Sequence, residues 1–172
     1  MKNQFSTFDL KALGIPRERL KDWMNQGFVE PSIPAQGKGT KAIFSLLDVY
    51  AIAFFSELLQ AGFNRKVAAE IVKDFKGRES IKGTTGENIT KVLFRFETRG
   101  QGRVIKSISF GPGSWAMDIS NGRSGQYDPE GALPLRPFDI PSFMGDSFDE
   151  NYDEILIVNF RKIRDRVNRV FS

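Results

Sequence analysis

The sequence contains no cysteine and no histidine in its 172 residues. Without cysteine there is no disulfide, no thiolate nucleophile and no sulfur-ligated metal. Without histidine the chain also lacks the commonest general base and the commonest ligand of transition metals. No paired arrangement of carboxylate, lysine, serine or tyrosine residues is evident in their place. We therefore expect no catalytic residue, no metal and no cofactor, and we do not expect an enzyme.

Long apolar runs are absent as well. No stretch approaches the roughly 18 consecutive apolar residues of a membrane helix, and the first five residues contain no apolar signal region. We expect a cytoplasmic protein with no membrane partner. What is present is a mild basic excess, with a net charge of +4, and 16 phenylalanines among 40% apolar residues. The charge is compatible with nucleic acid, and the apolar content is sufficient for a core.

The composition changes across residues 76–88, which are rich in glycine and polar side chains. Before this stretch apolar residues recur at helical spacing, and after it short strand-like runs alternate with glycine and proline. The sequence predicts an α+β protein with residues 1–76 as one domain, 77–88 as a linker and 89–172 as a second domain.

The first domain is predicted to hold four helices and a β-hairpin. A helix over residues 7–13 with Phe8, Ala12 and Leu13 facing inward precedes a turn at Gly14. A second helix covers 17–26 until Gly27 adopts a left-handed conformation. Extended pieces around a glycine-rich tip follow, as expected of a hairpin. Two further helices complete the domain, one over 46–61 with a Ser45–Asp48 capping pair and one beginning after Asn64.

Several segments in unbroken order resemble the MerR family of bacterial transcription regulators. They are Gly14-Ile15-Pro16 with Leu20-Lys21-Asp22-Trp23, Gly27-Phe28-Val29-Glu30-Pro31, Gly39-Thr40-Lys41-Ala42-Ile43-Phe44-Ser45, Asp48-Val49 and Leu58-Leu59-Gln60-Ala61-Gly62-Phe63. The resemblance covers about residues 5–75 and implies a winged helix-turn-helix domain that binds double-stranded DNA. It implies a regulator of transcription, associated with the nucleoid.

The resemblance also indicates which residues would face DNA. A helix can enter the major groove while an adjacent hairpin tip reaches the phosphate backbone. The helix residues expected at the groove are Arg17, Arg19, Lys21 and Asp22, and the wing residues expected at the backbone are Lys38, Thr40 and Lys41.

The chain departs from the family pattern at two places. Lys21-Asp22 stands where the family usually has Arg-Tyr, and Gly39-Thr40-Lys41 stands where it usually has Gly-Tyr-Arg. Phosphates repel a carboxylate at Asp22 unless it accepts a hydrogen bond from a cytosine amino group. Glycines 77, 83 and 86 also interrupt the place of the family's long dimerisation helix, so a long coiled coil is not expected.

The second half resembles no family that we recognise. Residues 89–98, 103–110, 115–120 and 154–158 are predicted to form a small antiparallel sheet, packed by a terminal helix after Asn159. We expect this half to hold a homodimer together, with sensing of an effector as an open alternative. Six acidic residues between 137 and 160 match no known metal-binding loop and are expected to be solvated.

Two other functions remain open at this point. One is an excisionase-like architectural factor that bends DNA. The other is a protein-interaction module that keeps the fold without DNA binding, which the carboxylates Glu18 and Asp22 favour.

Overall fold

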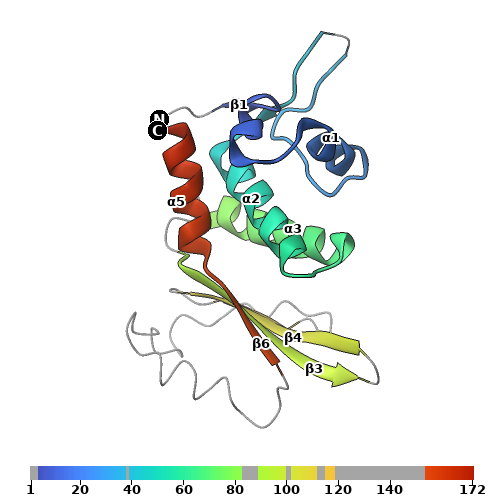
Figure 1. Ribbon diagram of the computed structural model, residues 1–172, viewed down its shortest axis with the longest axis vertical. Helices are drawn as coiled ribbons and strands as arrows, with labels where there is room; N and C mark the ends of the chain where they lie inside the picture. Colours follow the sequence, from blue (N-terminus) through green and yellow to red (C-terminus); the bar gives the residue numbers. More distant parts are fainter. Residues whose placement is uncertain (1–3, 38, 83–88, 100–101, 112–114, 119–153) are drawn as a thin grey trace. The chain divides into compact units, whose positions relative to one another are not determined.

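The computed structural model describes residues 4–37, 39–82, 89–99, 102–111, 115–118 and 154–172 (Figure 1). The chain divides into two compact units. The first contains Met1–Glu87 together with Lys162–Ser172, and the second contains Asn88–Arg161. The described residues form helices and two small antiparallel sheets, so the protein is of the α+β class.

The first unit begins with strand β1 (Phe5–Ser6), a short 3-10 helix η1 (Asp9–Leu13) and helix α1 (Arg17–Asn25). Strand β2 (Ile43–Phe44), helix α2 (Leu46–Gln60) and helix α3 (Arg65–Lys82) follow, and β1 pairs antiparallel with β2. The inward-facing prediction is wrong for Phe8 and Ala12: Phe8 is 77% exposed and Ala12 is exposed, Leu13 is half-buried, and Leu10 is the buried residue of η1. Phe8 precedes η1, and within η1 the 3-10 geometry rotates residues by about 120° rather than 100°, which changes the side that meets the core.

Helix α2 is the centre of this unit because it is apolar on almost all sides. Its Ser45–Asp48 capping box is present as predicted. Its buried apolar residues are Val49, Tyr50, Ala51, Ile52, Ala53, Phe54, Phe55 and Leu58. Asn64 caps α3 as predicted, since its Oδ1 accepts from the N–H of Val67 at 3.0 Å. The two helices meet through an edge-to-face contact between Phe54 and Phe75, with ring centroids 5.8 Å apart.

Helix α3 continues to Lys82, so it extends into the segment for which a linker was predicted. Gly77 lies inside this helix. A single glycine costs a helix only about 1 kcal/mol relative to alanine, and the surrounding lysine, glutamate and isoleucine residues favour continuation. The composition change is therefore a poor marker of where the helix ends.

The terminal helix α5 (Phe160–Phe171) differs most from expectation, because its residues from Lys162 onward belong to the first unit rather than packing with the sheet. Tyr50 Oη donates to Asn168 Oδ1 at 2.6 Å, and the rings of Phe5 and Phe171 lie 4.7 Å apart. The apolar stripe of α5 was recognisable in the sequence. A stripe indicates that one face is buried, but not which surface covers it.

The second unit contains a four-stranded antiparallel sheet in the order β5-β4-β3-β6. Its strands are β3 (Lys91–Arg99), β4 (Gly102–Gly111), β5 (Trp115–Asp118) and β6 (Glu154–Val158). Alternate residues Val92, Phe94 and Phe96 are buried on one face. A register shift after Arg95 pairs Phe96 with Ile105, which places Ile105 on that same face. The acidic residues from 139 to 153 lie outside the described part of the chain.

Candidate nucleic-acid interface

Helix α1 is fixed to the first unit by two fully buried side chains one turn apart. Leu20 is 0% and Trp23 is 1% exposed, and Trp23 meets Phe55 of α2 edge to face at 4.9 Å. The chain reaches α1 through Gly14 and leaves it through Gly27, both with left-handed φ angles of 78° and 72°. Glycine adopts this conformation without the steric cost that other residues meet. The left-handed turn predicted at Gly27 is confirmed.

The rest of the α1 surface is in contact with solvent. Glu18 and Lys21 are exposed on the side away from the core, and Arg17 and Arg19 are exposed on its two flanks. Arg17, Arg19 and Lys21 are three of the four helix residues that the sequence predicted to face DNA. Because Leu20 and Trp23 hold α1 to the core, the three cations are displayed from a fixed backbone.

Asp22 has protein partners in the structure. Its Oδ2 lies 3.3 Å from the guanidinium Nη1 of Arg65, and its Oδ1 accepts a hydrogen bond from the side chain of Gln26. Arg65 is the first residue of α3 and is 43 positions away in the sequence. No local pattern connects the two residues, and sequence reasoning missed Arg65.

The wing is only partly the hairpin that the sequence predicted. Ile33 and Ile43 exchange two backbone hydrogen bonds of 3.0 and 2.9 Å, which close the loop between them, and no longer ladder of strands is present in its described residues. That loop projects from the helices in Figure 1. Pro31 stands two residues before Ile33, where the next hydrogen-bonded pair would form, and it has no N–H to donate, so the ladder ends there. We call residues 34–42 the wing loop.

The tip of the wing loop is shaped by Thr40. Its backbone N–H donates to the carbonyl of Gly37 at 3.1 Å, while its hydroxyl donates to that carbonyl and accepts from the N–H of Gly37. The hydroxyl therefore stabilises the turn. Lys41 is exposed beside it. Lys38 lies outside the described residues.

The base of the wing loop is tied to both long helices by Asp48. This carboxylate is fully buried, and its Oδ1 is paired with the ammonium group of Lys76 on α3. Its Oδ2 accepts from the backbone N–H groups of Ser32 at 3.0 Å and Ser45 at 2.7 Å, and from the Ser32 hydroxyl. Lys76 also donates to the carbonyl of Glu30 at 3.2 Å. Sequence reasoning identified Asp48 only as a helix cap.

These contacts determine the charge state of Asp48. Burial by itself raises the pKa of a carboxyl group. Here the hydrogen bonds from Lys76, Ser32 and Ser45 and the positive charge of Lys76 outweigh burial, and they hold the pKa of Asp48 below its ordinary value of 3.8. The group is therefore ionised at neutral pH, and its pairing with Lys76 persists there.

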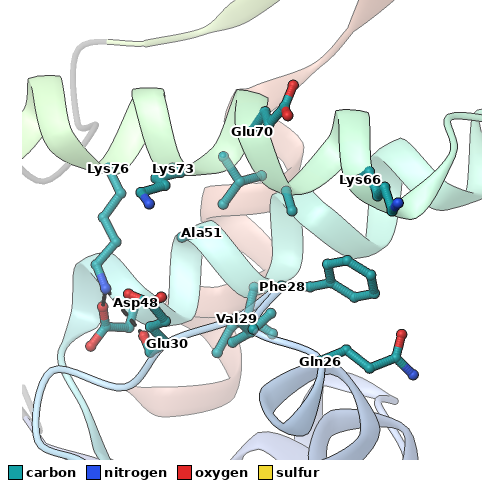
Figure 2. A pocket seen from close by; sticks show the side chains of 14 residues that line it. Gln26, Phe28, Val29, Glu30, Asp48, Ala51, Lys66, Glu70, Lys73 and Lys76 are labelled. Atoms are coloured by element: carbon teal, nitrogen blue, oxygen red, sulfur yellow. Dashed lines mark hydrogen bonds and ion pairs between the residues drawn. The ribbon is translucent and has the colours of Figure 1, made fainter.

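A cavity of about 310 Å³ lies beside this network, between α3 and the segment that joins α1 to the wing (Figure 2). Its apolar lining comes from Phe28, Val29, Ala51, Ile52, Ala69 and Val72. Lysines 66, 73 and 76 line it together with carboxylates of Glu30, Asp48 and Glu70. The lining thus carries both signs of charge, and two of these residues, Asp48 and Lys76, are paired with each other.

The part of the chain that the structure describes lacks two other kinds of feature. That part of the chain holds no cluster of three or more aspartate or glutamate residues arranged to bind a metal ion. Within the same residues, no helix is long and apolar enough to cross a membrane.

The comparison with known families agrees with this geometry. Residues 10–74 match the family model described as MerR HTH family regulatory protein. The match begins in η1 and ends in α3, so it covers α1, the wing loop and α2. No curated protein matches the chain. Residues 10–74 are thus similar to the helix-turn-helix region of MerR-type regulatory proteins.

Proposed function

We propose that the protein is a cytoplasmic, nucleoid-associated transcription regulator that binds double-stranded DNA with sequence preference through α1. The observation that carries this proposal is the two-sided character of α1. Leu20 and Trp23 hold one side in the core, while Lys21 is exposed on the other side and Arg17 and Arg19 are exposed on its flanks. This helix lies within the residues that match the MerR family model. A fixed helix with exposed cations suits the major groove, where side chains read base edges.

The wing loop would contact the phosphate backbone beside that groove. Lys41 is exposed, and the turn closed by Thr40 brings the loop back toward β2. We assign Lys38 and Lys41 to phosphates, and Thr40 to the shape of the loop and to a backbone contact. Phosphate contacts of this kind hold register on the duplex and carry no sequence information themselves.

Selection of bound duplexes from a random-sequence pool tests the proposal. The wild-type chain should enrich a shared motif. Arg19→Ala or Lys21→Ala should alter that motif, whereas the double change of Lys38 and Lys41 to Ala should weaken binding to all sequences alike. Arg169→Ala removes an exposed cation of α5 and serves as a charge control that leaves the motif unchanged. Enrichment of no motif, or an unchanged motif in both helix variants, would refute sequence reading by α1.

We further propose that the protein binds as a homodimer through its second unit. Reading a duplex with one small domain is usually too weak, and two copies double the contacts. Sedimentation at micromolar concentration should show a dimer, with or without DNA. A monomer under both conditions would contradict this part of the proposal.

A further inference from the structure

An acidic side chain on a DNA-reading helix presents an electrostatic problem. The side chain of Asp22 is 46% exposed, on the helix that also displays Arg19 and Lys21. Phosphates repel a free carboxylate at such a position, and the repulsion acts over roughly a Debye length of about 8 Å at physiological salt. The structure shows what compensates this charge.

Arg65 reaches Asp22 from a different helix. Its Nη1 lies 3.3 Å from Asp22 Oδ2, and its own side chain is 53% exposed. Gln26 donates to the other oxygen of the same carboxylate, so both oxygens have partners. Arg65 starts α3 immediately after the capping residue Asn64, whose bond to Val67 fixes that end of the helix. The guanidinium group is therefore presented to α1 from an ordered backbone.

We infer that Arg65 is a positioning residue for duplex binding that acts through Asp22. It neutralises the carboxylate and, with Gln26, holds it toward α3. The inference rests on the proposed function and adds a residue outside the helix and the wing loop. Asp22, in turn, is a partner of Arg65 and does not read a cytosine amino group.

Duplex affinities of single and double variants of Arg65 and Asp22 distinguish an action through Asp22 from a direct contact of Arg65 with DNA. Arg65→Gln leaves Asp22 uncompensated and should weaken binding by about three- to tenfold, the range expected for one charge near phosphates at a surface dielectric. Arg65→Lys retains the charge and should stay within about twofold of wild type. Asp22→Asn alone should bind as wild type or slightly more tightly.

The double variant Arg65→Gln with Asp22→Asn decides the matter, because it removes both charges. If Arg65 acts through Asp22, the double variant should recover most of the affinity that Arg65→Gln loses. The thermal unfolding midpoints of the four variants should differ little from that of the wild type, since exposed ion pairs contribute little to folding.

Three outcomes would overturn the inference. A double variant that binds as weakly as Arg65→Gln would mean that Arg65 contacts DNA directly. Wild-type binding by Arg65→Gln would mean that the pair has no part in binding. A wild-type chain that binds no duplex would refute the proposed function and this inference with it, and is distinguished from the first two by the wild-type titration.

Discussion

Replacing Asp48 by asparagine tests whether the buried network at the wing base holds the first unit together. The change keeps the size of the side chain and removes its charge. In the native protein one oxygen is paired with Lys76, and the other accepts from Ser32 and Ser45. Asparagine retains one acceptor, but its amide group brings an NH₂ toward the ammonium of Lys76.

The expected loss follows from the burial of Asp48, whose side chain is 0% exposed. Removing one partner of a buried ion pair costs about 3–5 kcal/mol. Lys76, the partner left unpaired, is 31% exposed, and asparagine still accepts one hydrogen bond, so we expect Asp48→Asn to lose about 3 kcal/mol, at the lower end of that range. With a urea m-value of about 1–3 kcal/mol/M, the unfolding midpoint of the first unit should fall by roughly 1–3 M.

Urea unfolding followed by circular dichroism measures this loss, and Glu57→Gln is the matched control. Glu57 pairs with Arg166 at 2.8 Å, but the side chains of the pair are 29% and 44% exposed. Solvent screens such a pair, so the control should lose less than about 1 kcal/mol. Equal losses in the two variants, or less than about 1 kcal/mol for Asp48→Asn, would refute the reasoning about burial.

The same comparison predicts a dependence on pH. The folded-state pKa of Asp48 lies below its unfolded value, so the stability that its charge contributes is complete at neutral pH and is lost as the pH falls through the folded pKa. The gap between wild type and Asp48→Asn should therefore be constant above about pH 5 and should narrow below about pH 4. A gap that widens in acid would contradict the assigned direction of the shift.

Three further changes test individual structural assignments. No nearby atom obstructs a Cβ at Gly27, so Gly27→Ala should destabilise by roughly 1–2 kcal/mol through its left-handed φ of 72° alone, whereas Gly77→Ala, inside α3, should stabilise by roughly 0.5–1 kcal/mol. Both effects are read from urea midpoints, and equal effects would contradict the left-handed assignment. Deleting residues 162–172 should destabilise the first unit by several kcal/mol, because burying Ile163 and Val167 each contributes about 1.5–3 kcal/mol. Unfolding of that unit unchanged by the deletion would contradict the placement of α5.

Much of the first unit was accessible from local sequence pattern. The capping box at Ser45, the cap at Asn64 and the left-handed Gly27 are each set by a few neighbouring residues, and each is present. The exposed positions of Glu18 and Lys21 follow from helical periodicity once Leu20 and Trp23 are placed inside.

The features that could not be predicted depend on contacts between residues far apart in the sequence. The pairing of Asp22 with Arg65, of Asp48 with Lys76, and of Tyr50 with Asn168 each joins distant segments. Periodicity indicates which side of a helix is buried or charged, but it does not identify the distant residue that contacts that side. The charge of Asp22 was therefore visible in the sequence, while its compensation was not.

The most direct test of DNA binding is the salt dependence of affinity for a labelled random-sequence duplex, measured by fluorescence anisotropy. Counterion release predicts that log K falls linearly with log salt concentration, with a slope of about −0.9 for each phosphate contacted. The double change of Lys38 and Lys41 to Ala should make that slope shallower by about two. An affinity that does not change with salt, or a slope that the double change leaves as it was, would contradict the account.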